Sequence, residues 1–267
     1  MTAAHTSVVT DLATATDVAA FVRESEGGIR IVGAGTWLEA GHSVNAAHTL
    51  RLTGTAGVRH YVPDDLTISV GAGTTLAELR AATAAHGQWC ALESWGDDRA
   101  TVGAVVATAT DGPFARALGR PRDLVLGIEC VDGLGRIIRA GGRVVKNVAG
   151  FDLTRLVTGA WGTLGIITEV HVRLRALSTA DETLLVRVED AAARARLDEF
   201  TSGPYAPLGC HRASEAVMPE RDGGGERWIV RIAGNARFVA AARAALAAVG
   251  DCAPLGVNVW ADVRRLD

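Results

Sequence analysis

Three glycine-rich stretches hold the residues best suited to contact a ligand. The first is Gly33-Ala34-Gly35-Thr36, which directly follows the apolar run IRIV. Glycine permits positive φ angles and a close approach of the backbone, so consecutive N–H groups here can converge on an anion such as a pyrophosphate. A tight turn that only ends a strand explains these four residues equally well. No glycine cluster spells GxGxxG or GxxxxGK[ST], so the Rossmann and Walker signatures are absent.

The second stretch is TVGAVVATATDG, from Thr101 to Gly112. Its residues are small on every side, so the backbone can lie unusually close to a flat and bulky ligand. Close packing between a helix and its neighbours is the alternative, because Gly and Ala commonly serve that purpose. The stretch alone leaves both interpretations open.

The third stretch, KNVAGFDLTRLVTGAWGTLG, covers residues 146–165. Residues 152–159 predict a short helix, and the glycines that follow it lead the chain into an alternating strand. Lys146 and Asn147 stand beside an apolar run, and polar side chains that leave water need hydrogen-bond partners. These two residues are therefore further candidates for a polar site.

Other kinds of site chemistry have little support. The seven histidines form no HExxH or HxH pattern and the four cysteines form no CxxC pair, so no metal site and no disulfide framework are predicted. GxSxG is absent, which leaves nucleophilic catalysis without a motif. The scattered tryptophans are typical of core or interface anchors. Trp37 and Trp95 flank the glycine loops, where an aromatic ring could also stack on a cofactor.

The composition is that of a globular protein that handles small molecules or protein partners. The chain has 267 residues, of which 48% are apolar and 21% charged, and a net charge of -3 with interspersed signs. Such a balance offers neither a nucleic-acid footprint nor a basic membrane patch. The first residues lack the pattern of a secretory signal and no stretch is long enough to span a membrane, so a cytoplasmic location is expected.

The elements that must position these stretches follow from periodicity and caps. A helix is expected over residues 16–26 with Thr16 as its N-cap, and a second helix opens at a capping box of Thr75 and Glu78. The strands IRIVG and TISVG both end in VGAGT, which indicates a sharp turn with exposed backbone at two places. Asp132-Gly133 predicts a hairpin turn, and residues 165–177 alternate as a strand does.

The pattern changes after Leu177. Residues 183–260 predict the order strand, helix, strand, strand, helix, strand, with VNVWADV as the last strand and RDGGGE as a hairpin tip. That order is typical of a ferredoxin-like unit. The fold class expected is therefore α+β, with one domain over residues 1–177 and a short ferredoxin-like cap domain over residues 178–267.

Taken together, these motifs resemble a known family. The order GAGT, YVPDDLTISVGAGTTLAEL, TVGA, the spaced residues of GP…G..RD…G, and VVKNVAGFDLTRLVTGAWGTLG is similar to the PCMH-type FAD-binding domain of the vanillyl-alcohol oxidase and p-cresol methylhydroxylase superfamily. Within that superfamily the glycolate oxidase FAD-binding subunits are the nearest likeness. The resemblance covers residues 16–176 and implies a two-lobed FAD domain followed by the cap.

The resemblance implies a role for each matching residue. It implies a pyrophosphate loop at the first glycine turn, contacts with the ribityl chain and flavin along TVGA, and contacts with the nucleotide near GTLG. Lys146 and Asn147 are implied to lie nearest the isoalloxazine, where a cation can stabilise a reduced flavin. The cofactor-binding residues expected are Gly33, Ala34, Gly35, Thr36, Trp37, Thr101, Val102, Gly103, Thr108, Gly119, Asp123, Lys146, Asn147, Gly162, Thr163, Gly165, Ile166 and Ile167.

The implied function is that of an FAD-dependent oxidoreductase subunit that removes a hydride from C2 of a small 2-hydroxy acid such as glycolate. Implied partners are a larger FAD-linked catalytic subunit and an iron-sulfur subunit. Ala104 departs from the family pattern, which commonly has a second glycine there. The histidine-rich metal motif of catalytic relatives is also missing, so no metal is expected. A non-catalytic assembly subunit and a free-standing small flavin oxidase remain alternatives, and no catalytic residue is assigned.

Overall fold

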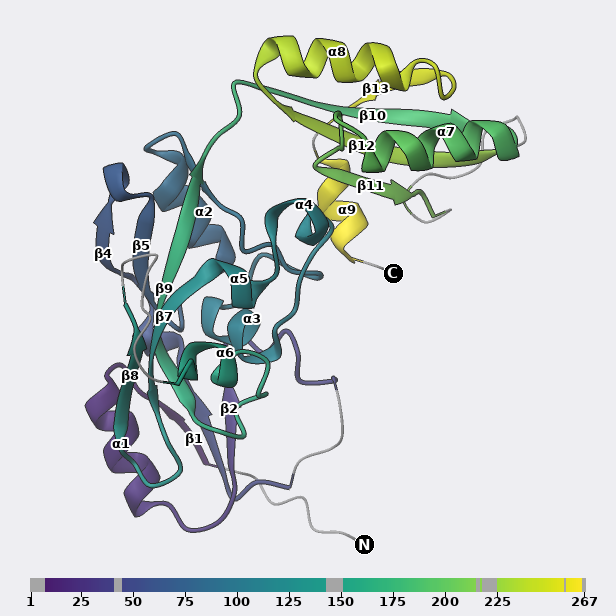
Figure 1. Ribbon diagram of the computed structural model, residues 1–267. Helices are drawn as coiled ribbons and strands as arrows, with labels where there is room; N and C mark the ends of the chain where they lie inside the picture. Colours follow the sequence, from purple (N-terminus) through teal and green to yellow (C-terminus); the bar gives the residue numbers. More distant parts are fainter. Residues whose placement is uncertain are drawn as a thin grey trace, which may run out of the picture. The chain divides into compact units, whose positions relative to one another are not determined.

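The computed structural model describes residues 8–40, 45–142, 151–214, 217, 225–256 and 258–265. The chain divides into two compact units (Figure 1). The first comprises Met1–Asp111 and Arg120–Ala176, and the second comprises Gly112–Gly119 and Leu177–Asp267. The second unit therefore takes one short segment from the middle of the first. Strands and helices occur in both units, so the predicted α+β class is confirmed.

A small parallel sheet opens the first unit. Its strands are β1 (Val8–Asp11), β3 (His48–Arg51) and β2 (Ile29–Val32), in the order β1-β3-β2. Helix α1 (Ala15–Glu24) buries Val18 and Ala19 against this sheet and against a larger one. The predicted N-cap Thr16 is wrong: the side chain of Thr14 accepts the N–H of Asp17 at 3.1 Å. Thr14 is the threonine with an acidic residue three positions later, as a capping box requires.

The larger sheet of the first unit is antiparallel, and its longest strand lies near its middle. Val170 of that strand is opposite Val70 on one side and Ile128 on the other, and all three are buried. The alternation predicted for residues 165–177 is confirmed, because Val170, Val172 and Leu174 face the core. The strands are β4 (Val58–Val62), β5 (Thr67–Gly71), β9 (Ile166–Ala176), β7 (Val125–Val131) and β8 (Ile137–Gly141), and β6 (Gln88–Cys90) pairs with the end of β9.

Short helices cover the buried face of this sheet. The capping box predicted at Thr75 and Glu78 is confirmed, since the two residues satisfy each other's backbone N–H groups. The turn predicted at Asp132 is also confirmed, because Asp132 exchanges backbone hydrogen bonds with Gly135 and Arg136. The remaining elements are α2 (Leu76–Ala84), α3 (Val102–Thr108), α5 (Pro121–Leu124), α6 (Leu153–Val157) and the 3-10 turns η1 (Thr53–Thr55) and η2 (Pro63–Asp65).

The second unit has a four-stranded antiparallel sheet in the order β11-β12-β10-β13. Two helices pack on one of its faces, where Leu184, Val230, Leu197 and Val239 belong to a common core. The elements are β10 (Ala180–Val188), α7 (Ala191–Ser202), β11 (Gly209–Arg212), β12 (Glu226–Gly234), α8 (Ala236–Leu246) and β13 (Cys252–Leu255). The order matches the whole ferredoxin-like pattern predicted for residues 183–260, and only the position of the last strand differs.

The last predicted strand is wrong. VNVWADV does not contain it: β13 ends at Leu255, and Val259–Arg265 forms helix α9. Trp260, Val263 and Arg264 are the buried residues of α9, and their spacing of three and four residues is helical rather than alternating. The apparent alternation of valines was therefore coincidental.

The second unit also includes residues 112–119, from the middle of the chain. This segment contains helix α4 (Ala115–Leu118). Phe114 is 2% exposed, with its ring 4.8 Å from the Trp260 ring and the Arg231 guanidinium 4.9 Å above it. Trp260 also donates from Nε1 to the hydroxyl of Thr183 at 2.9 Å. Segment 112–119 is thus part of this unit's packing.

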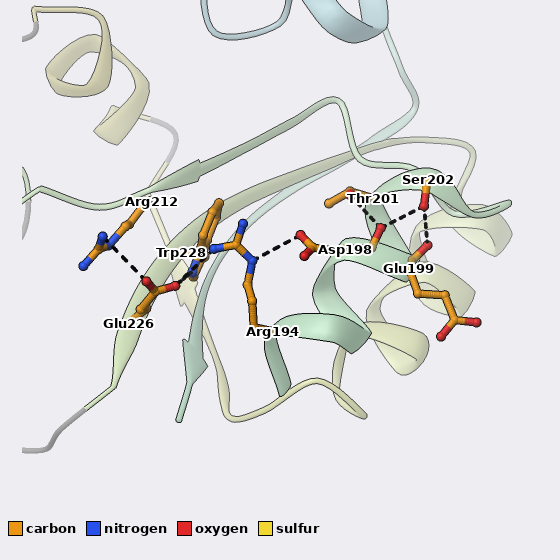
Figure 2. Close-up of polar contacts among 8 residues, drawn as sticks. All are labelled: Arg194, Asp198, Glu199, Thr201, Ser202, Arg212, Glu226 and Trp228. Carbon is orange, nitrogen blue, oxygen red and sulfur yellow. Dashed lines mark hydrogen bonds and ion pairs between the residues drawn. The ribbon is translucent and has the colours of Figure 1, made fainter. Parts of the chain in front are cut away.

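Helix α7 is fixed to its sheet by a charged cluster (Figure 2). The Arg194 guanidinium lies 4.4 Å from the centre of the Trp228 ring and pairs with Asp198 at 3.1 Å and with Glu226 at 3.3 Å. Glu226 also accepts the Trp228 N–H at 3.0 Å and pairs with Arg212 at 3.6 Å. Exposed ion pairs contribute little to stability, so these contacts add to the apolar packing of α7, in which Ala193, Leu197 and Phe200 are buried.

Candidate functional site

The first unit encloses a cavity of about 690 Å³. Three segments line it: β2 with the glycine turn after it, helix α3, and the turn that precedes β9. The volume lies in the range typical of small-molecule sites. The expected site residues that line it are Gly33, Gly35, Thr36, Trp37, Thr101, Gly103, Thr108, Gly162, Thr163, Gly165 and Ile167.

The glycine turn after β2 carries two buried polar side-chain atoms on residues that line this cavity. Gly35 has a φ of +80°, a left-handed conformation that glycine adopts without strain. Within the described part of the chain, Thr36 Oγ1 and Trp37 Nε1 are buried and have no hydrogen-bond partner. An indole N–H can only donate, and a hydroxyl can donate. Buried polar atoms are normally paired, so these two call for an acceptor-rich ligand such as a phosphate.

Helix α3 forms a second wall. Its N-cap is Thr101, whose hydroxyl accepts the N–H of Ala104 at 3.4 Å. Gly33 must be a glycine because a Cβ there would overlap the Thr101 hydroxyl. Gly103 likewise lets α3 rest on Ala72, whose Cβ would be 2.7 Å from an added methyl group. Glycine thus permits close packing at both positions. For TVGA, this agrees with the packing interpretation rather than requiring a ligand.

The turn before β9 forms the third wall. Trp161 and Gly162 are both left-handed, with φ values of +54° and +74°. The left-handed φ of Gly162 favours glycine, and a Cβ there would lie 2.8 Å from Cδ1 of Ile31, the movable end of that side chain. The hydroxyl of Thr163 donates to the carbonyl of Ala160 at 2.6 Å, and Ile167, which is 4% exposed, lines the cavity from the start of β9. Trp161, whose side chain is 54% exposed, also lines the cavity.

Several expected site residues do not line the cavity. Ala34 points to solvent, while Val102 and Ile166 are buried in the core. Gly119 ends helix α4 with a φ of +96° in the second unit. Asp123 accepts the backbone N–H of Arg120 at the start of α5. Lys146 and Asn147 lie outside the described residues.

The structure adds residues that sequence reasoning missed. Trp161, Leu38, Ile31 and Ala107 line the cavity although no motif singled them out. Ile31 belongs to the strand IRIV, and its neighbours in sequence gave no sign of which face it would present. The position of Trp161 between two glycines could have indicated a turn here. The residue type alone does not predict that a tryptophan adopts a positive φ.

Thiol and metal chemistry have little place at this site. Cys90 is 1% exposed in β6, and burial raises the pKa of its thiol to about 12, so the thiolate is scarce at neutral pH. Among the described residues, no three His, Cys, Asp or Glu side chains are grouped as metal ligands.

None of the helices described has the length and apolarity needed to cross a membrane.

Comparison with solved structures confirms the fold. A structure of alkyldihydroxyacetonephosphate synthase superposes with a TM-score of 0.78 at 17% sequence identity. The match covers 96% of this chain and 55% of that one, so both units belong to a larger architecture there. At this identity the likeness concerns the fold alone.

Curated relatives share more sequence. Glycolate oxidase subunit GlcE of Escherichia coli (strain K12) is 34% identical over 170 residues, which is 63% of this chain and 48% of the relative. Glycolate oxidase subunit GlcD of Bacillus subtilis (strain 168) is 34% identical over 181 residues, which is 60% of this chain and 38% of the relative. The chain therefore spans about half or less of the length of these relatives.

The model of one protein family matches the first half of the chain. It is described as an FAD binding domain and covers residues 4–141, which include the glycine turn after β2 and helix α3. FAD is accordingly the cofactor of this domain. On this evidence, the chain belongs to the FAD binding domain family.

Proposed function

We propose that the first unit binds FAD in the cavity between β2, α3 and the turn before β9. The carrying observation is the pair of buried and unpaired atoms, Thr36 Oγ1 and Trp37 Nε1, at the end of β2. Both can donate to phosphate oxygens, and the left-handed Gly35 beside them leaves the backbone open to the ligand. An unpaired buried donor costs about 1–3 kcal/mol, which a bound diphosphate would recover.

The other two walls have supporting roles in this proposal. Thr101, Gly103 and Thr108 give a wall of small side chains along α3, against which a long flat cofactor can lie. Gly162 and Gly165 present backbone rather than side chains on the opposite wall. The expected roles of Ala34, Val102, Gly119, Asp123, Ile166, Lys146 and Asn147 stay predictions.

We further propose that the chain is a subunit of an oxidoreductase that acts on a small 2-hydroxy acid, with glycolate as the first candidate. Support comes from its similarity to two proteins named as glycolate oxidase subunits. Bound FAD would supply the two-electron acceptor for a hydride from C2 of the acid. This chain's own residues would bind and orient the cofactor, and partner subunits would take the electrons onward.

The binding proposal is tested with charge at the glycine turn. Purified wild-type protein should carry or take up FAD and show flavin absorption bands. Gly35→Asp should abolish uptake, because a carboxylate would repel the diphosphate. Gly35→Asn is the matched control, since asparagine has the same shape, tolerates a positive φ and is uncharged. A colourless wild-type protein that FAD cannot reconstitute would refute the proposal.

The activity proposal is tested with glycolate and an artificial electron acceptor, first with this chain alone and then with its native complex. Turnover by the complex that falls with Gly35→Asp but not with Gly35→Asn supports a working flavin in this subunit. A complex that assembles and turns over normally with Gly35→Asp supports instead the assembly role. Turnover by the isolated chain would support a free-standing oxidase.

A further inference from the structure

Trp161 has a conformation that its residue type disfavours. Its φ is +54°, and its N–H donates to the carbonyl of Ala107 at 2.8 Å, which fixes the turn against α3. Bulky side chains rarely adopt the left-handed region, because Cβ crowds the following carbonyl. Glycine or asparagine would make the same turn without this penalty, and the neighbouring turn positions Gly159 and Gly162 are indeed glycines with positive φ.

Packing does not explain the choice of tryptophan. The side chain is 54% exposed, so much of the indole surface lies outside the core. A residue that only had to fill space would be buried, and a residue that only had to turn the chain would be small. An observed backbone outlier of this kind at a cavity is grounds for a functional hypothesis.

The indole instead contributes to the wall of the cavity. Trp161 lines it together with the apolar side chains of Ile31, Leu38 and Ala107. Thr36 and Trp37, whose buried Oγ1 and Nε1 atoms have no hydrogen-bond partner among the described residues, line the same cavity. One part of the site thus offers donors for an anion, while Trp161 offers a flat aromatic surface.

We propose that the indole of Trp161 stacks on a flat ring of the bound dinucleotide and is a determinant of cofactor affinity. The inference rests on the proposed function, that FAD binds in this cavity. FAD has two such rings, the adenine and the isoalloxazine, and both have the extended π surface that an indole can stack on. ADP contains the first ring and FMN the second, so the two ligands distinguish them.

The test is calorimetric titration of the full-length apoprotein with FAD, ADP and FMN. Trp161→Asn should lower FAD affinity at least about tenfold, because stacking of a base on an aromatic side chain is worth about that much or more. Trp161→Phe should stay within about threefold of wild type. Loss of ADP affinity in Trp161→Asn would assign the ring to adenine, and loss of FMN affinity would assign it to isoalloxazine.

Two controls exclude a general structural effect. Leu156→Asn changes a side chain of similar exposure, 58%, on helix α6, which does not line the cavity, and should leave all three affinities unchanged. The apoprotein with Trp161→Asn should melt at the wild-type temperature or above it, because asparagine tolerates a positive φ. A lower melting temperature with lost affinity would show a structural role and overturn the inference.

Failure of this inference is distinct from failure of the proposed function. If wild type binds FAD and Trp161→Asn binds it equally well, the stacking role is refuted while the FAD site stands. If wild type binds none of FAD, ADP and FMN, the FAD site itself is refuted, and the stacking role with it.

Discussion

The pentapeptide VGAGT occurs twice in the first unit, and the structure uses its two copies in opposite ways. The copy at residues 32–36 lines the cavity and leaves Thr36 Oγ1 unpaired within the described part of the chain. In the copy at residues 70–74 the hydroxyl of Thr74 accepts the N–H of Gly57 at 2.9 Å, and the threonine is 2% exposed. One copy is open towards a ligand, and the other is closed by protein.

The glycines differ as much as the threonines. Gly35 takes a positive φ, and a Cβ there would meet only the flexible end of Leu38, at 3.3 Å. Gly71 and Gly73 have no positive φ, but a Cβ on either would overlap a backbone carbonyl oxygen, of Thr55 and Leu52 respectively. Gly35 thus has room for a side chain, whereas Gly71 and Gly73 are closely packed against backbone. The surroundings of each glycine depend on the segment that packs against it, and the pentapeptide itself does not specify that segment.

The largest difference between the copies should appear on adding a methyl group. Gly71→Ala should lower the free energy of unfolding by about 3 kcal/mol, because the backbone of Thr55 cannot move aside easily. Gly35→Ala should cost about 1 kcal/mol, for its left-handed backbone alone. Urea unfolding of the two apoproteins measures both values. Equal losses would show that the second copy is not held by close packing.

The two threonines should separate stability from binding. Thr74→Val should lower the free energy of unfolding by about 1 kcal/mol, since it removes the hydrogen bond that the buried Thr74 hydroxyl accepts from the N–H of Gly57. Thr36→Val should raise apoprotein stability by about 1 kcal/mol but weaken FAD binding about tenfold, since it removes a buried and unpaired donor. Unfolding curves and FAD titrations of both variants give the comparison. It fails if Thr36→Val destabilises the apoprotein as much as Thr74→Val does.

The smallest effect concerns the contact between the first copy and helix α3. Gly33→Ala alone should cost about 2 kcal/mol, because the new Cβ overlaps the Thr101 hydroxyl. Combining it with Thr101→Ala should recover about 1 kcal/mol, measured as the coupling energy of a double-mutant cycle. Additive losses would mean that the overlap is relieved elsewhere.

Local rules were enough for the elements with strong local signals. The capping box at Thr75, the turn at Asp132 and the alternation through Val170 followed from the sequence because neighbours in the chain determine them. Helix α9 was missed because its valines alternate while burial of Trp260 and Val263 follows the helical period. Tertiary packing, rather than local propensity, determines that this segment is a helix and not a strand.

The site was predicted in part for the same reason. Motifs located the three walls of the cavity, but not which side chain of each wall faces it. Val102 and Ile166 belong to two of these motifs but are buried in the core. Trp161, between Gly159 and Gly162, was not expected at the site but lines the cavity. Orientation of single side chains depends on backbone angles that residue types only restrict.

Segment 112–119 has a consequence for how the chain is made. Phe114 is translated with the first unit, but its packing partner Trp260 lies roughly 150 residues later. At about 5–20 residues per second, the ribosome delivers that partner roughly seven to thirty seconds after the phenylalanine. During this interval the ribosome supplies Arg231, whose guanidinium lies over the Phe114 ring, but not yet the Trp260 ring. The second unit therefore cannot complete its packing around Phe114 before residue 260 has been synthesised.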